Sequence, residues 1–287
     1  MLITVLTPTY NRAKLLERLY QSLCQQTYQD FEWIVVNDGS KDNTDEVVQS
    51  FIKENRIQIH YIQQENGGKH RAINNGIKIA KGELFFIADS DDWLLPTTLE
   101  KVVYHYKTIK NDFSIGGVCG LDIDQNGKVI GNGLPFNTID CSPTEIRMKY
   151  HVEGDLKEVF KTNVFRDFPF PEIEGERFCP EAVVWNRFSR LYKLHYFNEP
   201  IYVAEYQEEG LTSSIVRIRM QSPISATLCY KEMLDDNISL FQKIRASINY
   251  WRFRFCKSPY PFPKVSMKWY VTLPLGYIMH LKDLRTI

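Results

Sequence analysis

The sequence predicts an α/β fold with a mostly parallel sheet flanked by helices, followed by a C-terminal helical appendage. Apolar runs alternate with segments of helical periodicity over residues 2–109, which is the pattern of a parallel sheet covered on both faces. Beyond residue 221, apolar residues recur three or four positions apart, as in long amphipathic helices. We therefore expect a sheet-based domain over residues 1–221 and a helical, basic and aromatic region over residues 222–287.

The first part of the chain predicts alternating strands and helices with short connections. The strand runs are rich in β-branched and aromatic residues, whereas leucine, isoleucine and valine recur at helical spacing between them. The run from Leu84 to Ala88 contains no polar residue, so we expect it at the centre of the sheet, buried on both faces. The expected strands are residues 2–6, 31–36, 57–62 and 84–88, and the expected helices are residues 15–27, 43–55, 71–80 and 96–109.

The second part of the chain predicts antiparallel additions to this sheet. Asn126-Gly127 is a strong hairpin signal between expected strands at residues 116–123 and 127–131. Residues 133–180 are rich in proline and are expected to be irregular. We expect a helix to open at Pro180, and a strand at residues 202–206 to lead into a polar loop at residues 207–214.

Composition and charge narrow the class of protein. The chain has 287 residues and no formal net charge, which argues against a general nucleic-acid binder. Its six cysteines are scattered without a C-x-x-C pair, which favours reduced thiols in a cytoplasmic protein over disulfides or a zinc site. No apolar run approaches the roughly 20 residues that span a bilayer. The N-terminus also lacks the basic start of a signal peptide, so we expect a cytoplasmic location.

Three carboxylates stand directly after the expected central strand, in the segment Asp89-Ser90-Asp91-Asp92. Neighbouring negative charges repel one another, and a divalent cation bound to a phosphate-bearing ligand would relieve this repulsion. The carboxyl ends of parallel strands are also where open α/β sheets bind ligands. We therefore interpret Asp89 and Asp91 as metal ligands. The alternative is an acidic start for the helix near Pro96, a role that suits Asp92.

Polar residues at the other strand ends are expected to converge on the same edge of the sheet. They are Thr9, Asp38 and Lys69. The chain has neither a G-x-G-x-x-G after the first strand nor a G-x-x-x-x-G-K-[ST], so the common dinucleotide and P-loop sites are not indicated. Gly67-Gly68-Lys69 leaves two interpretations open, a phosphate contact and a flexible turn with an exposed lysine. By its position in the first turn of a helix, Glu181 would interact favourably with the helix dipole and need have no other role.

Four segments in this order carry a resemblance to a known family. They are Thr7-Pro8-Thr9-Tyr10-Asn11-Arg12, Val36-Asn37-Asp38-Gly39-Ser40, Asn66-Gly67-Gly68-Lys69 and Asp89-Ser90-Asp91-Asp92. Over residues 1–215 the chain resembles family 2 of the glycosyltransferases. The resemblance implies the Rossmann-like GT-A fold, a nucleotide-diphosphate-sugar donor, for which we expect UDP, and a Mn²⁺ or Mg²⁺ cofactor. It also implies inversion at the anomeric carbon and a glycan or lipid-linked acceptor in surface polysaccharide synthesis.

The resemblance also implies a role for each matching residue. Contacts to the nucleotide-sugar are expected from Thr7, Pro8, Tyr10, Asp38, Lys69, Asp89 and Ser90. Among these, Asp38 matches the acceptor of a hydrogen bond from uracil, and Asp91 matches the direct metal ligand, with Asp89 beside it. Glu181 matches the catalytic base, although Pro180-Glu181-Ala182 stands where many members have Glu-Asp. Residues 206–212 resemble family loops that close over the donor.

Two other functions are compatible with a metal-carboxylate site on such a sheet. A metal-dependent nucleotidyltransferase would usually have a glycine-rich loop and a basic residue after the first strand, where this chain has Thr7-Pro8-Thr9-Tyr10-Asn11. A nucleotide-sugar-binding module without activity would not need Asp38, Asp89, Asp91 and Glu181 together.

The last part of the chain, residues 243–287, is basic and aromatic. Nine lysines and arginines oppose the single acid Asp283, and the aromatic residues are interleaved among them from Trp251 to Tyr270. Such a segment suits an anionic membrane surface, which would hold the enzyme near lipid-linked acceptors. Equally, it suits a helical subdomain that packs its aromatic side chains on the catalytic core and exposes an ordinary basic face to solvent. The sequence leaves both interpretations open, and also the oligomeric state.

Overall fold

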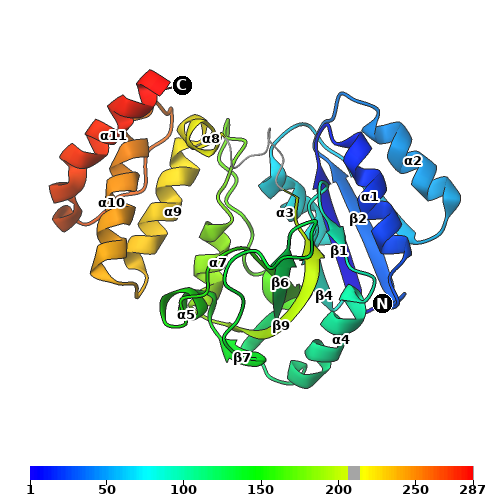
Figure 1. Cartoon of the computed structure of the whole chain (residues 1–287). Coiled ribbons are helices and arrows are strands. Elements are labelled where there is room, and N and C mark those ends of the chain that lie inside the picture. Colours follow the sequence, from blue (N-terminus) through cyan, green and yellow to red (C-terminus); the bar gives the residue numbers. More distant parts are fainter. Residues whose placement is uncertain (206–213, 287) are drawn as a thin grey trace. The chain divides into compact units, whose positions relative to one another are not determined.

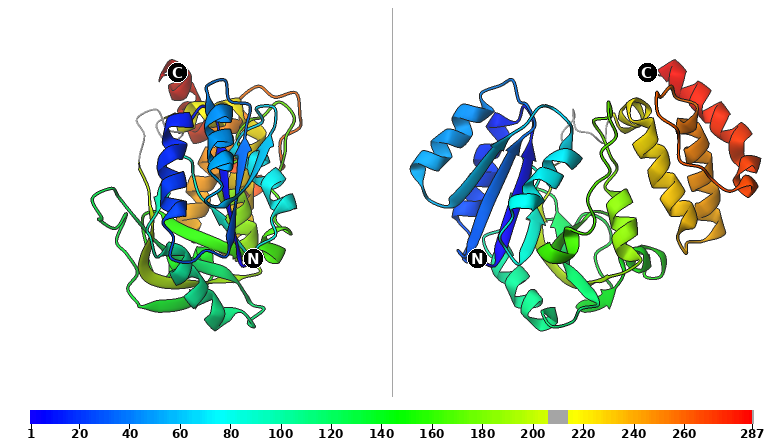
Figure 2. Two further views of the ribbon diagram at one scale, coloured as in Figure 1. Left: turned by 90° about the vertical axis from the view of Figure 1, so that its right-hand side faces the viewer. Right: turned by 180° about the vertical axis from the view of Figure 1, so that it is seen from behind.

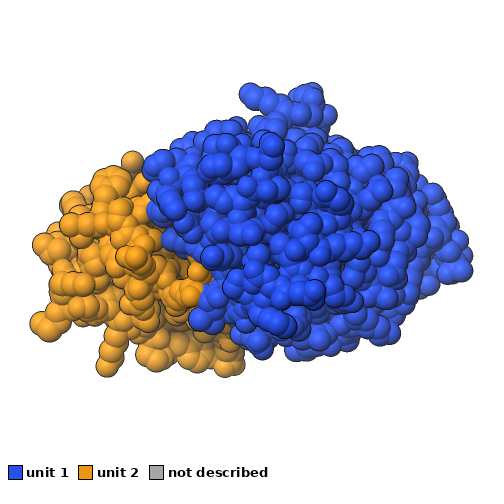
Figure 3. All heavy atoms as spheres, turned by 90° about the horizontal axis from the view of Figure 1, so that it is seen from below, with its two compact units in different colours: residues 1–169, 191–207 blue, residues 170–190, 208–287 orange. Residues whose placement is uncertain are grey.

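The chain forms two compact units in the computed structural model, which describes residues 1–205 and 214–286 (Figure 1; Figure 3). Unit 1 comprises residues 1–169 and 191–207, and unit 2 comprises residues 170–190 and 208–287. Each unit has its own cluster of buried apolar side chains. Residues 170–190 thus pack with the C-terminal helices. The boundary expected between residues 221 and 222 separates a catalytic domain from a helical region. That division by catalytic role stays a prediction.

The described residues contain nine strands, eleven α-helices and one 3₁₀ helix. The strands are β1 (Ile3–Thr9), β2 (Phe31–Asn37), β3 (Gln58–Gln63), β4 (Leu84–Ile87), β5 (Trp93–Leu94), β6 (Ile115–Ile123), β7 (Thr138–Cys141), β8 (Leu156–Lys161) and β9 (Lys193–Val203). The helices of unit 1 are α1 (Ala13–Cys24), α2 (Thr44–Glu54), α3 (Lys69–Ile79), α4 (Thr98–Ile109), α5 (Pro143–Met148) and α6 (Thr162–Phe165). Those of unit 2 are α7 (Ala182–Ser189), α8 (Ile215–Gln221), α9 (Pro223–Asp235), α10 (Leu240–Arg254), η1 (Met267–Thr272) and α11 (Leu273–Thr286).

All nine described strands belong to one sheet in unit 1, with the order β3-β2-β1-β4-β8-β6-β9-β5 and β7 paired to β9. The first four strands are parallel, and their register sets Thr9 beside Asn37 and Asn37 beside Gln63. Their carboxyl ends therefore meet at one edge, as the sequence predicts. β8 is antiparallel to both β4 and β6. The predicted α/β class is confirmed, and the sheet is mixed beyond β4.

Helices cover both faces of the parallel strands (Figure 1; Figure 2). On one face, Tyr20 of α1 stacks on Phe51 of α2 with ring centroids 4.0 Å apart, and both lie against Trp33 of β2. On the other face, α3 approaches β1 so closely that a Cβ at Gly76 would lie 2.1 Å from Leu6 Cδ1. Because helices cover the sheet on both faces, the strand ends and the loops that follow them are held at fixed positions.

A buried glutamate fixes the entry to β4. Glu32 is 0% exposed, and its Oε1 accepts hydrogen bonds from Thr4 Oγ1 and Lys81 N, each at 2.6 Å. Thr4 Oγ1 accepts in turn from Gly82 N at 2.9 Å. A Cβ at Gly82 would lie 2.4 Å from Thr4 N, so only glycine allows this close approach. This network sets where the acidic segment after β4 begins.

Three predictions of local structure are wrong. The first strand does not end at Leu6 but continues to Thr9, because Thr7 and Pro8 pair with Val35 and Val36 of β2. The Asn126-Gly127 turn forms, with Gly127 at φ +80°, but residues 127–131 make only an isolated bridge between Val129 and Ile123. Residues 133–180 are not irregular, since they contain β7, α5, β8 and α6.

The strand predicted at residues 202–206 is also longer than expected. β9 begins at Lys193 and ends at Val203, because it pairs along most of its length with β6 and β7. Polar or charged residues interrupt the first half of β9 and all of β8, so their apolar content alone does not identify them. These strands are stabilised by partners that are distant in sequence.

Unit 2 is helical. Tyr230, Tyr250, Trp251, Phe253 and Trp269 are buried in its core. Glu176 accepts hydrogen bonds from Ile224 N at 2.6 Å and Ser225 N at 2.8 Å, so it caps the start of α9. In residues 1–205 and 214–286, no helix has both the length and the apolar character needed to cross a bilayer. The six cysteines all lie within these residues, and each is a free thiol.

Candidate active site

The loops after β1 and β2 are joined by Asn11, which has the left-handed φ of +52°. Its backbone N donates to Ser40 Oγ at 2.9 Å, and its Oδ1 accepts from Lys41 N at 2.7 Å. The expected nucleotide contacts Thr7 and Pro8 lie buried inside β1, where Thr7 Oγ1 accepts a hydrogen bond from Trp33 Nε1 at 2.9 Å. Tyr10 is 43% exposed, so among the three expected nucleotide contacts of this segment it is the one that faces solvent.

Asp38 organises the loop that follows β3. Its carboxylate is 4% exposed and accepts hydrogen bonds from the backbone N–H groups of Gly67 and Gly68, each at 2.8 Å. Gln64 Nε2 also donates to it at 2.8 Å. Gly68 has a φ of +98°, which favours glycine, and directly precedes α3. The sequence did not predict this loop-anchoring role, and the expected contact to uracil stays a prediction.

Lys69 and Asp89 form the ion pair that joins the loop after β3 to the acidic segment after β4. Lys69 Nζ lies 2.6 Å from Asp89 Oδ1. Burial alone would raise the pKa of Asp89, but the charges of Lys69 and Lys157 outweigh this effect, so the pKa lies below its usual range. Lys69 is ion-paired and its side chain is 29% exposed, which disfavours the interpretation of Gly67-Gly68-Lys69 as a flexible turn with an exposed lysine, and the phosphate contact stays a prediction.

Asp91 and Asp92 have different environments. Burial, and then the charge of Asp89, raises the pKa of Asp91, while Arg12 Nη2 lies 4.0 Å from its Oδ2. Asp92 is not an N-cap of α4, because Thr97 holds that position. Instead, Asp92 Oδ1 accepts from Glu205 N at 2.9 Å, and burial followed by the charge of Asp89 raises its pKa to about 6. Asp92 thus ties the acidic segment to the end of β9.

Arg18 of α1 holds this segment from the other side. Its Nη2 donates to the backbone O of Asp91 and pairs with Glu205 Oε2, each at 2.5 Å. Its guanidinium also lies 3.9 Å from the ring centroid of Trp93. Sequence reasoning missed Arg18, because a single arginine within a helical pattern gives no signal. Arg12, also missed, directly follows the loop residues at the end of β1 and could have been found from that position.

A second group of polar side chains lies beside Asp89. Tyr202 OH accepts from Asp89 N at 2.7 Å, and Lys157 Nζ lies 3.6 Å from the Tyr202 ring centroid. Asp122 is 4% exposed, and burial raises its pKa to about 8 although the charge of Lys157 lowers it. Asp122 could have been found in the sequence as an acid inside the apolar strand Leu121-Asp122-Ile123. Lys157 could not, because β8 itself was not predicted.

The carboxylates after β4 fit a divalent cation that a phosphate ligand helps to hold. The described residues contain no group of three or more His, Cys, Asp or Glu side chains arranged for a metal. Mg²⁺ and Mn²⁺ in nucleotide sites are commonly held by one or two carboxylates together with substrate phosphates, so a pair is sufficient. Asp89 is paired with Lys69, whereas burial, and then the charge of Asp89, raises the pKa of Asp91. The role of Asp91 as the direct cation ligand stays a prediction.

Glu181 belongs to unit 2, at the residue before α7. Its side chain is exposed, and its backbone O accepts from Val184 N at 2.9 Å and Trp185 N at 3.1 Å. The other predicted site residues, from Thr7 to Asp91, belong to unit 1 and come together as described. The loop predicted at residues 206–212 lies outside the described residues.

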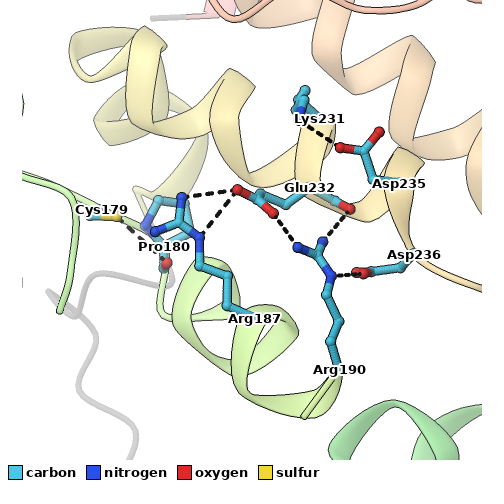
Figure 4. Close-up of polar contacts among 8 residues, drawn as sticks. All are labelled: Cys179, Pro180, Arg187, Arg190, Lys231, Glu232, Asp235 and Asp236. Carbon is cyan, nitrogen blue, oxygen red and sulfur yellow. Dashed lines mark hydrogen bonds and ion pairs between the residues drawn. The ribbon is translucent and has the colours of Figure 1, made fainter. Parts of the chain in front are cut away.

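The helix that begins after Glu181 is fastened to α9 by ion pairs (Figure 4). Arg187 Nη2 lies 2.9 Å from Glu232 Oε1, and Arg190 Nη1 lies 2.7 Å from Glu232 Oε2. Arg190 Nε also pairs with Asp236 Oδ1 at 2.5 Å. Burial raises the pKa of Glu232, but the hydrogen bonds from Arg187 and Arg190 outweigh it, so the pKa lies below its usual value. The position of α7 thus depends on α9.

A mixed sheet whose parallel strands β1–β4 carry an acidic pair and a lysine at their carboxyl ends has these polar groups where open α/β sheets bind ligands. Residues 4–155, more than half of the chain, match the family described as "Glycosyl transferase family 2". The chain belongs to this family, and it is a glycosyltransferase. Membership decides against the nucleotidyltransferase alternative.

Two relatives illustrate the family. The chain is 30% identical over 215 residues to glycosyltransferase GlyG of Streptococcus pneumoniae, covering 70% of each chain. It is 30% identical over 186 residues to the GalNAc(5)-diNAcBac-PP-undecaprenol beta-1,3-glucosyltransferase of Campylobacter jejuni, covering 64% of this chain and 58% of that enzyme. It spans only 21–38% of the length of six other glycosyltransferases that it matches.

Solved structures share the fold. TarS of S. aureus in complex with UDP-GlcNAc has a TM-score of 0.65 at 18% identity, covering 100% of this chain and 90% of that one. The mannosyltransferase PcManGT of Pyrobaculum calidifontis, in complex with GDP-Man and Mn²⁺, has a TM-score of 0.56 at 18% identity, covering 99% and 75%. The predicted GT-A fold is confirmed.

Proposed function

We propose that this glycosyltransferase moves a sugar from a uridine diphosphate donor to a glycan or lipid-linked acceptor in the synthesis of a surface polysaccharide. The observation that carries the proposal is the Lys69–Asp89 ion pair, which joins two strand ends. This pair brings a lysine that can contact phosphate close to carboxylates that can hold a cation. A nucleoside diphosphate bound with a metal ion requires both groups. The TarS complex with UDP-GlcNAc supports a uridine donor, and GDP is the competitor to test.

The residues of unit 1 would bind and orient the donor. Asp91 would hold Mn²⁺ or Mg²⁺, with Asp89 and Ser90 beside it, and Lys69 would contact the diphosphate. A bound cation would stabilise the negative charge that develops on the departing diphosphate. Tyr10, exposed after β1, would lie against the nucleoside, and Asp38 would hold the Gly67-Gly68 loop while it contacts the base.

Glu181 would act as the general base. As the acceptor oxygen bonds to the anomeric carbon and the bond from that carbon to the diphosphate breaks, Glu181 would take the proton of the acceptor hydroxyl. A single displacement with one base gives inversion. The carboxylate of Glu181 is exposed at the start of α7, which is consistent with access to an acceptor.

Two observations support the proposed acceptor and location. The Campylobacter relative is named for an undecaprenol-linked acceptor, which supports a lipid-linked acceptor here. The six free cysteines support a reducing compartment, and therefore the cytoplasmic side of a membrane.

Calorimetry with UDP tests the proposal. We expect UDP binding with Mn²⁺, much weaker binding with a chelator, and weaker binding of GDP. Asp91→Asn should abolish the effect of Mn²⁺, whereas Asp30→Asn, which changes a carboxylate with a 57% exposed side chain, should not. Equal UDP affinity with Mn²⁺ and chelator would overturn the metal role. The anomeric configuration of the sugar first released by donor hydrolysis, read by NMR, tests inversion, and a retained configuration would exclude it.

A further inference from the structure

The last helix of unit 2 has its apolar side chains on the outside. Five apolar side chains along η1 and α11 are 39–87% exposed: Met267, Val271, Leu275, Ile278 and Leu281. We call these five residues the outer face. Their spacing of three or four residues places them along one side of the helix. A surface helix normally presents its polar residues to solvent, so this arrangement is the reverse of the usual one.

Small and polar residues fasten the inner side of the same helix to α10, beside the apolar Trp269 and Leu273, which pack in the core of unit 2. Thr272 Oγ1 lies 2.8 Å from Ser247 Oγ of α10, and Asp283 pairs with Arg252 at 2.5 and 2.7 Å. Gly276 allows a close approach, since a Cβ there would lie 2.3 Å from Trp251 Cβ. These contacts fix the orientation of α11 on α10. The outer face therefore cannot turn inward without breaking the buried Arg252–Asp283 ion pair.

The exposed charged residues of the segment that carries the outer face, residues 264–285, are all positive. Lys264, Lys268, Lys282 and Arg285 are exposed. Asp283 is the only acid between residues 237 and 286, and it is 6% exposed and paired. An apolar stripe with a basic border has the chemistry of a helix that lies in the plane of an anionic lipid surface.

A second copy of the chain fits this face less well. A two-fold interface sets the same patch against itself, so Lys282 and Arg285 would oppose their own copies. No exposed acid of η1 or α11 could compensate them. A membrane-spanning role is also excluded for α11, because its 14 residues extend only about 21 Å, against about 30 Å of hydrocarbon.

We infer that the outer face of η1 and α11 docks on the surface of an anionic phospholipid bilayer. This inference identifies the residues for the contact predicted over residues 243–287, and it does not depend on the donor or on Glu181. The aromatic residues Trp251, Phe253 and Trp269, together with Arg252, belong to the fold of unit 2 instead. These aromatic residues are buried, as the packing interpretation expects, and they pack within unit 2.

Co-sedimentation of the full chain with vesicles tests the inference. We expect binding to vesicles that contain phosphatidylglycerol, little binding to phosphatidylcholine alone, and a decrease as salt rises. Leu275→Gln with Ile278→Gln should reduce the partition coefficient at least tenfold. Lys282→Gln with Arg285→Gln should reduce it about 30-fold, since each basic side chain near an anionic surface contributes about 1 kcal/mol, or about fivefold.

The matched control is Tyr104→Gln with Phe113→Gln, which removes two apolar side chains that are 67% and 90% exposed in unit 1 and should leave vesicle binding unchanged. Melting temperature and UDP affinity should be the same for all variants. The inference is overturned by a lack of sedimentation with anionic vesicles at low salt, or by normal binding of the Leu275/Ile278 variant. It is also overturned if that variant dissociates a dimer that forms without lipid.

Discussion

At the scale of single residues, a conservative substitution separates the proposed role of Glu181 as general base from its position at a helix start. Glu181→Gln keeps the size of the side chain at the start of α7 but removes the proton acceptor. We expect transfer to fall by about 10²- to 10⁴-fold with UDP affinity unchanged. The measurement is a steady-state transfer assay beside UDP calorimetry. Glu172→Gln, which changes an exposed glutamate of the same unit, should keep full activity. Near-normal turnover of Glu181→Gln would leave Glu181 with a helix-start role only.

Asp38 offers a second test, because its carboxylate accepts hydrogen bonds from Gly67 N and Gly68 N. Asp38→Asn turns one acceptor into a donor, so at least one of these buried N–H groups loses its partner at a cost of about 1–3 kcal/mol. We expect a lower melting temperature in the absence of ligand, and weaker UDP binding because Lys69 follows this loop. If the melting temperature is unchanged and only nucleoside affinity falls, Asp38 acts on the base alone.

The candidate site could be predicted from the sequence where strand ends carry polar residues. Asp38, Lys69, Asp89 and Asp91 were found in this way, and the structure brings them together across the ends of β2, β3 and β4. What could not be predicted is what surrounds them. Arg18, Lys157, Tyr202 and Glu205 reach the acidic segment from helix α1, from β8 and from β9, which lie far away in sequence. Only three-dimensional packing shows such contacts.

At the scale of secondary structure elements, the same distinction explains the fold prediction. β1 to β4 and α1 to α4 were predicted because each apolar run is local and ends in turn residues. β8 has the sequence Leu-Lys-Glu-Val-Phe-Lys, and it is a strand because β4 and β6 supply its hydrogen-bond partners on both sides. Asn126-Gly127 predicted the turn correctly. Residues 127–131 do not form a strand, because only Val129 makes a bridge, to Ile123.

The link between α7 and α9 makes a prediction about stability and pH. The folded-state pKa of Glu232 lies below its usual value because the hydrogen bonds from Arg187 and Arg190 outweigh burial. Its contribution is therefore present above the unfolded pKa of about 4.3 and is lost as pH falls through the folded value. Glu232→Gln should lower the free energy of unfolding by about 1.5–3 kcal/mol at pH 7, and by less near pH 3.

The control for this prediction lies on the same helix. Lys231 Nζ pairs with Asp235 Oδ2 at 2.6 Å, and the Asp235 side chain is 52% exposed (Figure 4). Asp235→Asn should change the free energy of unfolding by about 0.5 kcal/mol or less, because exposed i,i+4 pairs contribute little. Urea unfolding at both pH values measures the difference. An equal effect of the two substitutions would show that the Glu232 network does not fasten α7.

At the scale of the whole molecule, the two compact units divide the predicted roles. The residues expected to bind the donor are in unit 1, whereas Glu181 is in unit 2 with α9, α10 and α11. The sequence suggested an appendage after residue 221, since helical periodicity changes there. It could not show that residues 170–190 pack with this appendage, because Glu176, Arg187 and Arg190 find their partners in α9 through tertiary contacts.

A chain shortened to residues 1–221 tests whether catalysis follows the predicted boundary after residue 221 or the division into two compact units. It retains the predicted catalytic domain, but it lacks Glu232, Asp236 and the start of α9, which hold Arg187, Arg190 and Glu176. We expect UDP and Mn²⁺ to bind within a few fold of the full chain, because Asp38, Lys69, Asp89 and Asp91 remain in an intact sheet. Transfer should fall at least as far as in Glu181→Gln, because α7 has lost its support. Full transfer by the shortened chain would instead establish residues 222–287 as an appendage that catalysis does not need.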